Sequence, residues 1–405
     1  MQVKKALSKR SFFNILIEIM IPVYMCMVFV LSFNTDTNVY ARMMAVVLIG
    51  ILGLYLLLRN RMVFDSFVGL LVVFWFFCLI SCLWAWDSSI AFSKCISLFQ
   101  LFLLIYLIYN YLVIEEKIDY FIACLCFSTT FFSIYTVFFF GVEEYFAGLE
   151  DGIRMGAEIA NVNTVGVYAA MAVLVNLWYA FYRKKYWALI LAVICAIVSM
   201  GSGSRKAIIA LFVGMIFLFV ATGNTKKRIK GIFVLICLLI GLLIALQLPI
   251  FETARERIIL LFETMSGTHS GGSADIRFKM IDIGMEQFWK TPIGGIGIAN
   301  AQLITLKELN WQTYLHNNYV ELLSSVGIVG TVIYYSMYIV PMSYFVSKNK
   351  LSNPKVTLAL VLLLVTLVLH YGMVAYTEKM EYMFIILFFL VVRDVKKEKE
   401  HVKNN

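Results

Sequence analysis

A single histidine, His316, stands where a long polar segment gives way to an apolar one, in the string His316-Asn-Asn-Tyr-Val-Glu321. We expect a helix to begin there, and the positive end of a helix dipole favours a neutral imidazole. A neutral imidazole accepts a proton from a hydroxyl at neutral pH, which makes His316 the candidate general base. The alternative is a histidine satisfied by a neighbouring carboxylate or by a lipid phosphate.

Arginines beside apolar segments form the second group that could do chemistry. Arg205 lies in Ser202-Gly-Ser-Arg-Lys206 between two apolar runs, Arg277 begins an amphipathic stretch, and Arg154 lies in a shorter polar segment. Charge close to a bilayer normally has a partner, and arginine can bind two phosphate oxygens at once. The glycine and serines beside Arg205 would let backbone N–H groups approach an anion. Alternatively, these arginines anchor loops to lipid headgroups or carboxylates.

Metal and cofactor chemistry has weaker support. Asp275, Asp282 and Glu286 cluster in the long polar segment and could hold a divalent metal near a diphosphate. A solvated helix face with ion pairs to Lys279 or Lys290 explains them better, so we predict no metal. The eight cysteines fall within or beside apolar runs and indicate neither a metal site nor a disulfide framework. Gly295-Ile-Gly297 lacks the third glycine of a dinucleotide fingerprint, and no cofactor is predicted.

Composition indicates the surroundings of these residues. The 405 residues are 61% hydrophobic and 15% charged, whereas soluble domains are near 45–50% apolar and about 25% charged. The apolar runs are continuous rather than alternating, which predicts membrane-spanning helices and excludes a β-barrel. The net charge of +9 is explained by cations in short cytoplasmic loops, so we expect the lipid bilayer and no nucleic acid as a partner.

About twelve apolar runs approach the length that spans a bilayer, which predicts an all-α integral membrane protein. They are residues 12–33, 39–58, 63–83, 90–114, 120–141, 163–181, 187–201, 207–222, 231–248, 318–346, 356–375 and 382–393. Lysine and arginine concentrate in alternate loops, which places both chain ends in the cytoplasm. The first run is interpreted as a retained helix rather than a cleaved signal peptide.

These spans divide the chain into four parts. Residues 1–248 hold nine spans, 249–317 form a large extracytoplasmic loop, 318–393 hold three spans, and 394–405 form a cytoplasmic tail. A loop as long as 249–317 usually has a function. Within it we expect a helix over 252–265, a flexible joint over 267–273, and an amphipathic helix around 278–288 with its apolar side on the membrane surface.

Six motifs together resemble the O-antigen ligase and O-antigen polymerase superfamily of bacterial surface-polysaccharide assembly, over about residues 80 to 375. They are Ser81-Cys-Leu-Trp-Ala-Trp-Asp87, Arg154-Met-Gly156 with Asn163, Gly203-Ser-Arg-Lys-Ala207, Arg277, Pro292-Ile-Gly-Gly-Ile-Gly297, and His316-Asn317 with Gly327. The chain departs from the family pattern at Val162, where proline is usual, and at Lys206, where glycine is usual.

The resemblance implies a bundle of the GT-C type in the bacterial cytoplasmic membrane, with one large loop over the site. Such a protein transfers an oligosaccharide from undecaprenyl diphosphate to an acceptor hydroxyl, without a metal. Arg205 and Arg277 would bind the diphosphate and His316 would activate the acceptor, while Arg154, Lys206 and Asn317 complete the predicted substrate-binding set. The implied partners are the lipid-linked donor, a glycan acceptor and other assembly proteins such as a chain-length regulator.

Two alternatives remain beside the repeat-unit polymerase. A ligase would move finished glycan onto a lipid A-core or another acceptor. Lys206, Arg154, Arg255 and Arg257 would offer a lipid-linked acceptor a second cationic area, which favours the polymerase. A polysaccharide or lipid transporter or flippase would place its charged site near the bilayer midplane, whereas the candidates here cluster at the outer ends of the predicted spans.

Overall fold

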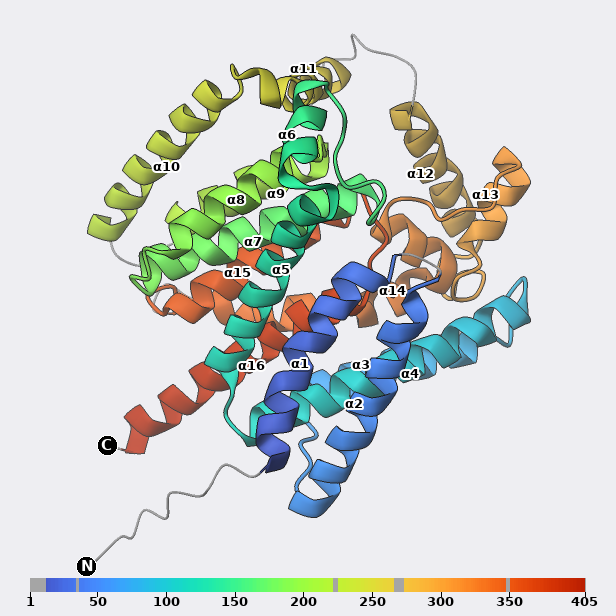
Figure 1. Cartoon of the computed structure of the whole chain (residues 1–405). Coiled ribbons are helices and arrows are strands. Elements are labelled where there is room, and N and C mark those ends of the chain that lie inside the picture. Colours follow the sequence, from blue (N-terminus) through green and yellow to red (C-terminus); the bar gives the residue numbers. More distant parts are fainter. Residues whose placement is uncertain (1–11, 34–35, 221–224, 266–272, 347–349, 405) are drawn as a thin grey trace, which may run out of the picture.

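The fold is a bundle of helices, seen in Figure 1 in a computed structural model. The structure describes residues 12–33, 36–220, 225–265, 273–346 and 350–404. Every regular element in these ranges is a helix. The prediction of an all-α membrane protein is confirmed, since several of the helices are strongly apolar.

Each predicted span falls on a helix within the described ranges. These helices are α1 (Phe12–Leu31), α2 (Asn38–Arg59), α3 (Ser66–Ser81), α4 (Ser88–Ile114), α5 (Ile118–Phe140), α7 (Val162–Tyr182), α8 (Ala188–Gly201), α9 (Arg205–Val220), α10 (Thr225–Ala245), α14 (Asn318–Phe345), α15 (Pro354–Leu369) and α16 (Lys379–Asn404). Among the described residues, seven helices are long and apolar enough to cross a membrane, namely α1, α2, α4, α5, α7, α10 and α14. The chain is a multi-pass membrane protein.

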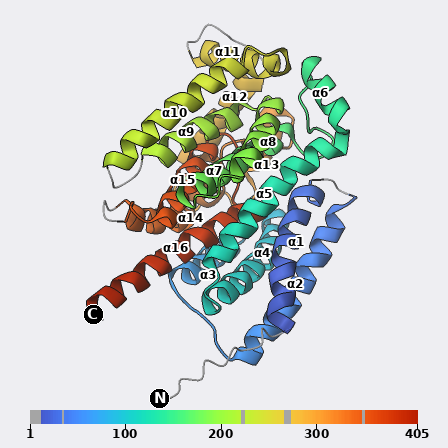
Figure 2. The same cartoon turned by 60° about the vertical axis from the view of Figure 1, so that its left-hand side comes forward.

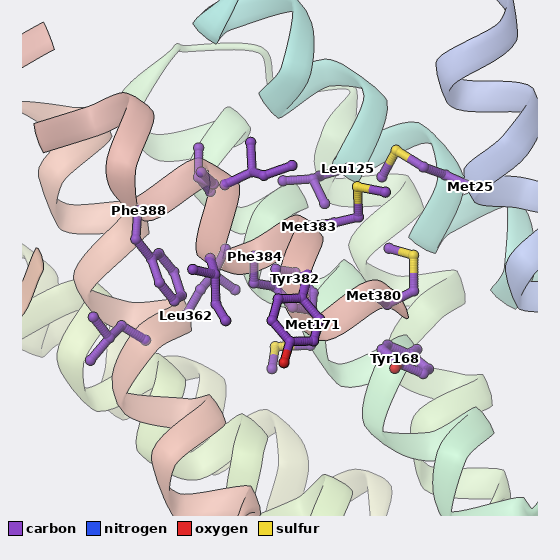
Figure 3. Close-up of a cluster of buried hydrophobic side chains, with 14 of the residues drawn as sticks. Met25, Leu125, Tyr168, Met171, Leu362, Met380, Tyr382, Met383, Phe384 and Phe388 are labelled. Atoms are coloured by element: carbon purple, nitrogen blue, oxygen red, sulfur yellow. The ribbon is translucent and has the colours of Figure 1, made fainter. Parts of the chain in front are cut away.

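Helix α16 lies at the centre of the bundle. Every residue from Met380 to Val392 is buried, and Figure 3 shows Met383 and Phe384 among side chains of α1, α5, α7 and α15. Helix α16 continues to Asn404, past the predicted span over 382–393, so most of the predicted tail over 394–405 is helical. Lysine and glutamate, which fill this extension, are good helix formers and prolong the helix beyond the apolar run.

The remaining helices lie in the predicted loop over 249–317 and in the segment between the predicted spans 120–141 and 163–181. They are α6 (Val142–Glu150), the 3-10 turn η1 (Pro249–Phe251), α11 (Glu252–Met265), α12 (Ser273–Lys290) and α13 (Ala301–Leu309). The predicted helices of the long loop are therefore present, while residues 267–272 of the predicted joint lie outside the described residues. In Figures 1 and 2, α11 and α12 lie at the end of the molecule away from the C-terminal end of α16.

The apolar side of α12 packs largely against protein rather than lipid. Met280 is fully buried and Phe288 is 8% exposed, and Met280 clusters with Ile296 and Leu315. Of the other residues in the predicted apolar stripe, Phe278 is 50% exposed, and Ile281 and Met285 are partly buried. The helix is amphipathic because it covers α13 and the start of α14.

Ion pairs gather at the other end of the bundle. Among the described residues they join Arg59 to Glu115 (3.1 Å), Lys117 to Glu18 (3.0 Å), Arg393 to Asp65 (2.9 Å), and Lys355 to Asp119 (3.3 Å) and Asp394 (3.1 Å). All of these residues belong to segments that the lysine and arginine pattern assigns to the cytoplasmic side or to the helix ends beside it. Their convergence supports the predicted alternation of helix directions.

A cation-lined cavity as the candidate functional site

A cavity of about 460 Å³ lies at the end of the bundle opposite these ion pairs. Its walls come from α4, α7, α9, α12, α13 and α14 and from the segments after α1 and before α14 and α16. Three predicted site residues line it together: Lys206, Arg277 and His316. Arg205, Arg154 and Asn317 belong to neighbouring structure and are not among the lining residues.

A tight turn starts helix α9 and sets the position of Lys206. Gly203 has φ +57°, and the Ser204 hydroxyl accepts a bond from the Ala207 backbone N–H at 3.4 Å. The turn packs closely on α7, where a Cβ added to Gly166 would lie 2.1 Å from the Ser202 hydroxyl. The glycines and serines that suggested an anion nest therefore serve close packing and helix capping.

Arg154 ties its loop to this turn. Its Nε donates to the Ser202 carbonyl at 2.9 Å, and a terminal guanidinium nitrogen donates to Asn163 Oδ1 at 3.2 Å. Asn163 lines the cavity while Arg154 does not. This geometry agrees with the alternative that Arg154 anchors its loop. Arg154 also positions Asn163, which lines the cavity.

Lys206 and Arg277 give one wall of the cavity a positive charge. Within the described parts of the chain, neither forms an ion pair with a carboxylate, in contrast to the cations at the opposite end. The Lys206 chain is held against the segment before α16, since a Cβ on Gly372 would lie 2.9 Å from Lys206 Cε. Two partly buried cations without a carboxylate partner favour an anionic ligand.

The segment that carries His316 is held rigidly. His316 has φ +56°, a left-handed conformation that few residues other than glycine adopt. Next to it, Asn317 caps α14 by accepting bonds from the N–H groups of Tyr319 (3.0 Å) and Val320 (3.2 Å). Buried Glu321 accepts a bond from Leu315 N–H at 2.9 Å. Asn317 thus orients His316 rather than facing the cavity itself.

His316 is neutral at physiological pH, for a stronger reason than the helix dipole. Burial, followed by the positive charges of Arg277 and Lys206, lowers the pKa of His316 to about 4. The imidazole is also stacked obliquely against Tyr314, with ring centroids 4.2 Å apart. An anion bound beside the two cations would offset their charge and raise this pKa.

The cavity also contains charged residues that the sequence interpretation did not select. Lys94 from α4, Glu321 from α14 and Glu378 from the segment before α16 all line it. Lys94 and Glu321 lie inside predicted spans, where a charge is by itself a sign of function, so a signal for these two was present. Glu378 lies in a short loop and had no such signal.

Three of the family-like motifs meet in one backbone junction beside the cavity. Helix α14 is broken at Gly327, where φ is +63°, and the freed Ile328 N–H donates to the Pro292 carbonyl at 2.8 Å. Gly295 has φ +66°, and a Cβ there would lie 2.4 Å from the Ser325 backbone. Trp86 N–H donates to the Ile296 carbonyl at 3.0 Å. These glycines are therefore required for the close packing of this junction.

The acidic residues of α12 lie away from the cavity. Asp275, Asp282 and Glu286 are exposed, and Glu286 pairs with Lys290 at 2.7 Å. In the part of the chain that the structure describes, they do not form a group of three or more side chains able to hold a metal ion. The ion-pair interpretation of Glu286 agrees with this geometry.

Comparison with known protein families gives one match. Residues 190–335 match the O-antigen ligase family model. The matched region contains Arg205, Lys206, Arg277 and His316 and leaves out Lys94 and Glu378. No curated protein matches the chain. The predicted resemblance to the O-antigen ligase and polymerase superfamily is confirmed, which indicates a membrane glycosyltransferase of this type.

Proposed function

We propose that this O-antigen ligase-type membrane protein transfers an oligosaccharide from undecaprenyl diphosphate to an acceptor hydroxyl, extending the repeat units of a surface polysaccharide. The observation that carries the proposal is the meeting of Lys206, Arg277 and a neutral His316 in one cavity. These residues come from segments far apart in the chain. Together they supply an anion site and a base, which is what the transfer requires.

In the proposed reaction the bond between the anomeric carbon and the diphosphate oxygen breaks. The diphosphate leaves with the bonding electron pair, and the acceptor oxygen forms the new bond while giving its proton to His316. Arg277 and Lys206 stabilise the negative charge that develops on the diphosphate, the largest single effect available to such a site. The same negative charge raises the pKa of His316 and makes it a better base. Arg205 remains a predicted diphosphate ligand.

The proposed location is the bacterial cytoplasmic membrane, with the cavity on its outer side and both chain ends inside. The cation-rich loops support this orientation, because they lie at the end of the bundle away from the cavity. A lipid diphosphate is already an activated leaving group, so the reaction needs no nucleotide on that side of the membrane.

Lys94 supports the polymerase, in which both substrates are lipid diphosphates. It adds a cavity cation to Lys206 and Arg277 on a different helix. Two of the cations predicted to bind a lipid-linked acceptor already have protein partners. Arg154 bonds to Ser202, and Arg255 pairs with Glu252 at 2.8 Å. The side chain of Arg257 lies outside the described residues.

The ligase is the second candidate, because the matched family carries that description. Purified protein given only the undecaprenyl-diphosphate repeat unit should produce a ladder of lengthened lipid-linked products. A protein that transfers glycan only after a separate acceptor is added would be a ligase instead.

A transporter has less support from the geometry. A broken helix is typical of transporter sites, and α14 is broken at Gly327. That break is closed by backbone bonds from Ile328 to Pro292 and from Val329 to Ile293, and Gly327 does not line the cavity. The charged cavity residues lie near one end of the helices that carry them.

Arg277 gives the sharpest test of the anion site. Replacing Arg277 by Ala should lower transfer by about 100-fold or more, and Arg277→Lys should restore little, because an ammonium group cannot bind two oxygens in one plane. Lys290→Ala is the matched control, since Lys290 is an exposed cation of the same helix and pairs with Glu286. Full transfer by a correctly inserted Arg277→Ala protein would contradict the proposal.

A further inference from the structure

Glu378 presents to the cavity a carboxylate that the proposed transfer does not use. The side chain is partly buried, and in the described parts of the chain no hydrogen bond or ion pair of this carboxylate is found. Burial raises the pKa of Glu378 above its usual value, with Glu381 adding to the rise and Lys379 and Lys94 opposing it. Because Glu378 lines the cavity and has no donor among the described residues, its carboxylate can accept hydrogen bonds from a bound ligand.

A different carboxylate, that of Glu381, holds the neighbouring helices together. Glu381 lies at 3.1 Å from His370 Nε2 and also accepts a bond from the Tyr338 hydroxyl. His370 Nδ1 is 3.2 Å from the Tyr335 hydroxyl. This buried network joins α14, α15 and α16 without Glu378, so Glu378 is not needed to hold the helices together.

Asn318 holds Glu378 in a fixed relation to His316. Its Oδ1 accepts bonds from the N–H groups of Ala375 (2.8 Å) and Tyr376 (3.1 Å). Asn318 follows His316 by two residues, and Glu378 N–H closes a turn onto the Ala375 carbonyl at 2.9 Å. The segments that carry the candidate base and this carboxylate are thus bonded together by one side chain.

The chemistry around Glu378 selects the kind of ligand. A carboxylate repels a diphosphate, but it accepts hydrogen bonds from hydroxyl groups. Neutral polar side chains line the same cavity: Asn163, Thr164, Gln302, Gln312, Thr313 and Thr377. Such groups suit a neutral, hydroxyl-rich molecule. We propose that Glu378 accepts a hydrogen bond from a hydroxyl of the glycan that lies beside the diphosphate, and so binds sugar rather than phosphate.

This inference rests on the proposed function, and its test separates the two sugars that could supply the hydroxyl. Glu378→Gln and Glu378→Asp would be purified as full-length protein beside Glu286→Gln, a matched control at an exposed carboxylate outside the cavity. Three quantities would be measured: the Kd for sugar-free undecaprenyl diphosphate, the Kd for the glycan-bearing donor, and the KM for the acceptor.

Glu378→Gln should bind sugar-free undecaprenyl diphosphate as tightly as wild type, or more tightly, because a negative charge is removed. It should raise either the Kd for the glycan-bearing donor or the KM for the acceptor by about 10- to 100-fold. That is the usual effect of losing one hydrogen bond to a charged group. A higher Kd for the donor would mean that Glu378 binds the donor sugar. A higher KM for the acceptor would mean that it binds the acceptor sugar. Glu378→Asp should recover part of the loss, and Glu286→Gln should show none.

Unchanged constants for all three ligands would overturn the inference, as would an equal loss for sugar-free lipid, which would indicate a structural role. The proposed function is tested separately by wild-type turnover. If wild type shows no transfer, the comparison of glycan-bearing with sugar-free lipid still decides the role of Glu378.

Discussion

His316 combines two features that each cost free energy. Its backbone is left-handed at φ +56°, a conformation that costs about 1–3 kcal/mol for a residue other than glycine. Its imidazole lies near two cations that, together with burial, lower its pKa. Strain of this kind persists where neighbouring contacts determine the conformation, here the Asn317 cap and the Glu321 bond to Leu315. Both costs are consistent with a residue held for chemistry.

The pH dependence of transfer tests the electrostatics of His316. The base must be deprotonated, so kcat/KM, which reports on the free protein, should fall only as the pH drops through the pKa of about 4. The acid-side fall in kcat should occur at a higher pH, because the bound diphosphate offsets the positive charges of Arg277 and Lys206. Removing a positive charge with Lys206→Gln should likewise move the kcat/KM limb upward.

Rates would be measured from about pH 4.5 to 7, within which wild-type kcat/KM should be nearly flat. Above that range Lys206 begins to lose its charge, because burial and the neighbouring Arg277 lower its pKa to about 8. If kcat/KM of Lys206→Gln falls at the same pH as wild type, or at a lower pH, His316 is not the titrating group. His316→Ala should lose turnover and retain donor binding. Loss of donor binding in this variant would make His316 a phosphate ligand.

The helices around the cavity depend on close backbone contacts at a few glycines. Gly327 breaks α14, and the turn that contains Gly295 fills the break. The same turn contacts the segment after α3 through Trp86. This junction anchors the outer ends of α3 and α14 beside the cavity and sets where the segment before α14 begins. These motifs, which carried the family resemblance in the sequence, hold the backbone of the junction together.

Gly295→Ala should therefore destabilise the fold. The new Cβ would meet the Ser325 backbone at 2.4 Å, and alanine is strained at φ +66°, so we expect a cost of about 2–5 kcal/mol. Gly241→Ala is the control, because Gly241 is helical with no atom within 4 Å of an added Cβ. It should be neutral or stabilising by up to roughly 1 kcal/mol. Thermal unfolding in detergent compares the two, and equal melting temperatures would refute the close-packing account.

At the scale of the whole molecule, charge is segregated between the two ends of the bundle. One end is closed by ion pairs such as Arg393–Asp65 and Lys355–Asp394. The other end holds the cavity, in which Lys206 and Arg277 have no carboxylate partner among the described residues. The ion pairs stabilise the packing of the helices at one end, while the cations of the cavity at the other end can bind an anion.

Cysteine labelling tests which end faces the cytoplasm. In a background where the exposed Cys237 is replaced by Ser, Glu286→Cys should react with a membrane-impermeant maleimide added from outside. Lys185→Cys should react only after the membrane is permeabilised. Both positions are exposed and lie at opposite ends of the bundle. Reversed labelling would place the cavity in the cytoplasm and contradict a donor used outside it.

The sequence by itself determined the class of the protein and the course of its chain. The length of each apolar run predicts a helix, because backbone groups in lipid must bond within their own segment. The alternation of lysine and arginine predicts which loops share a side. His316 and Arg277 could also be selected, since an isolated histidine before a helix and an arginine near a membrane are unusual.

Only the tertiary structure decided which charges share the cavity. Arg205 and Lys206 are neighbours in the chain, yet Lys206 lines the cavity and Arg205 does not. Successive residues of a helix point about 100° apart, so the choice depends on how α9 is rotated against its neighbours. Lys94 and Glu378 also join the site through tertiary packing, which brings α4 and the segment before α16 to the cavity. Packing between distant helices sets those rotations, and the local pattern of residues does not contain them.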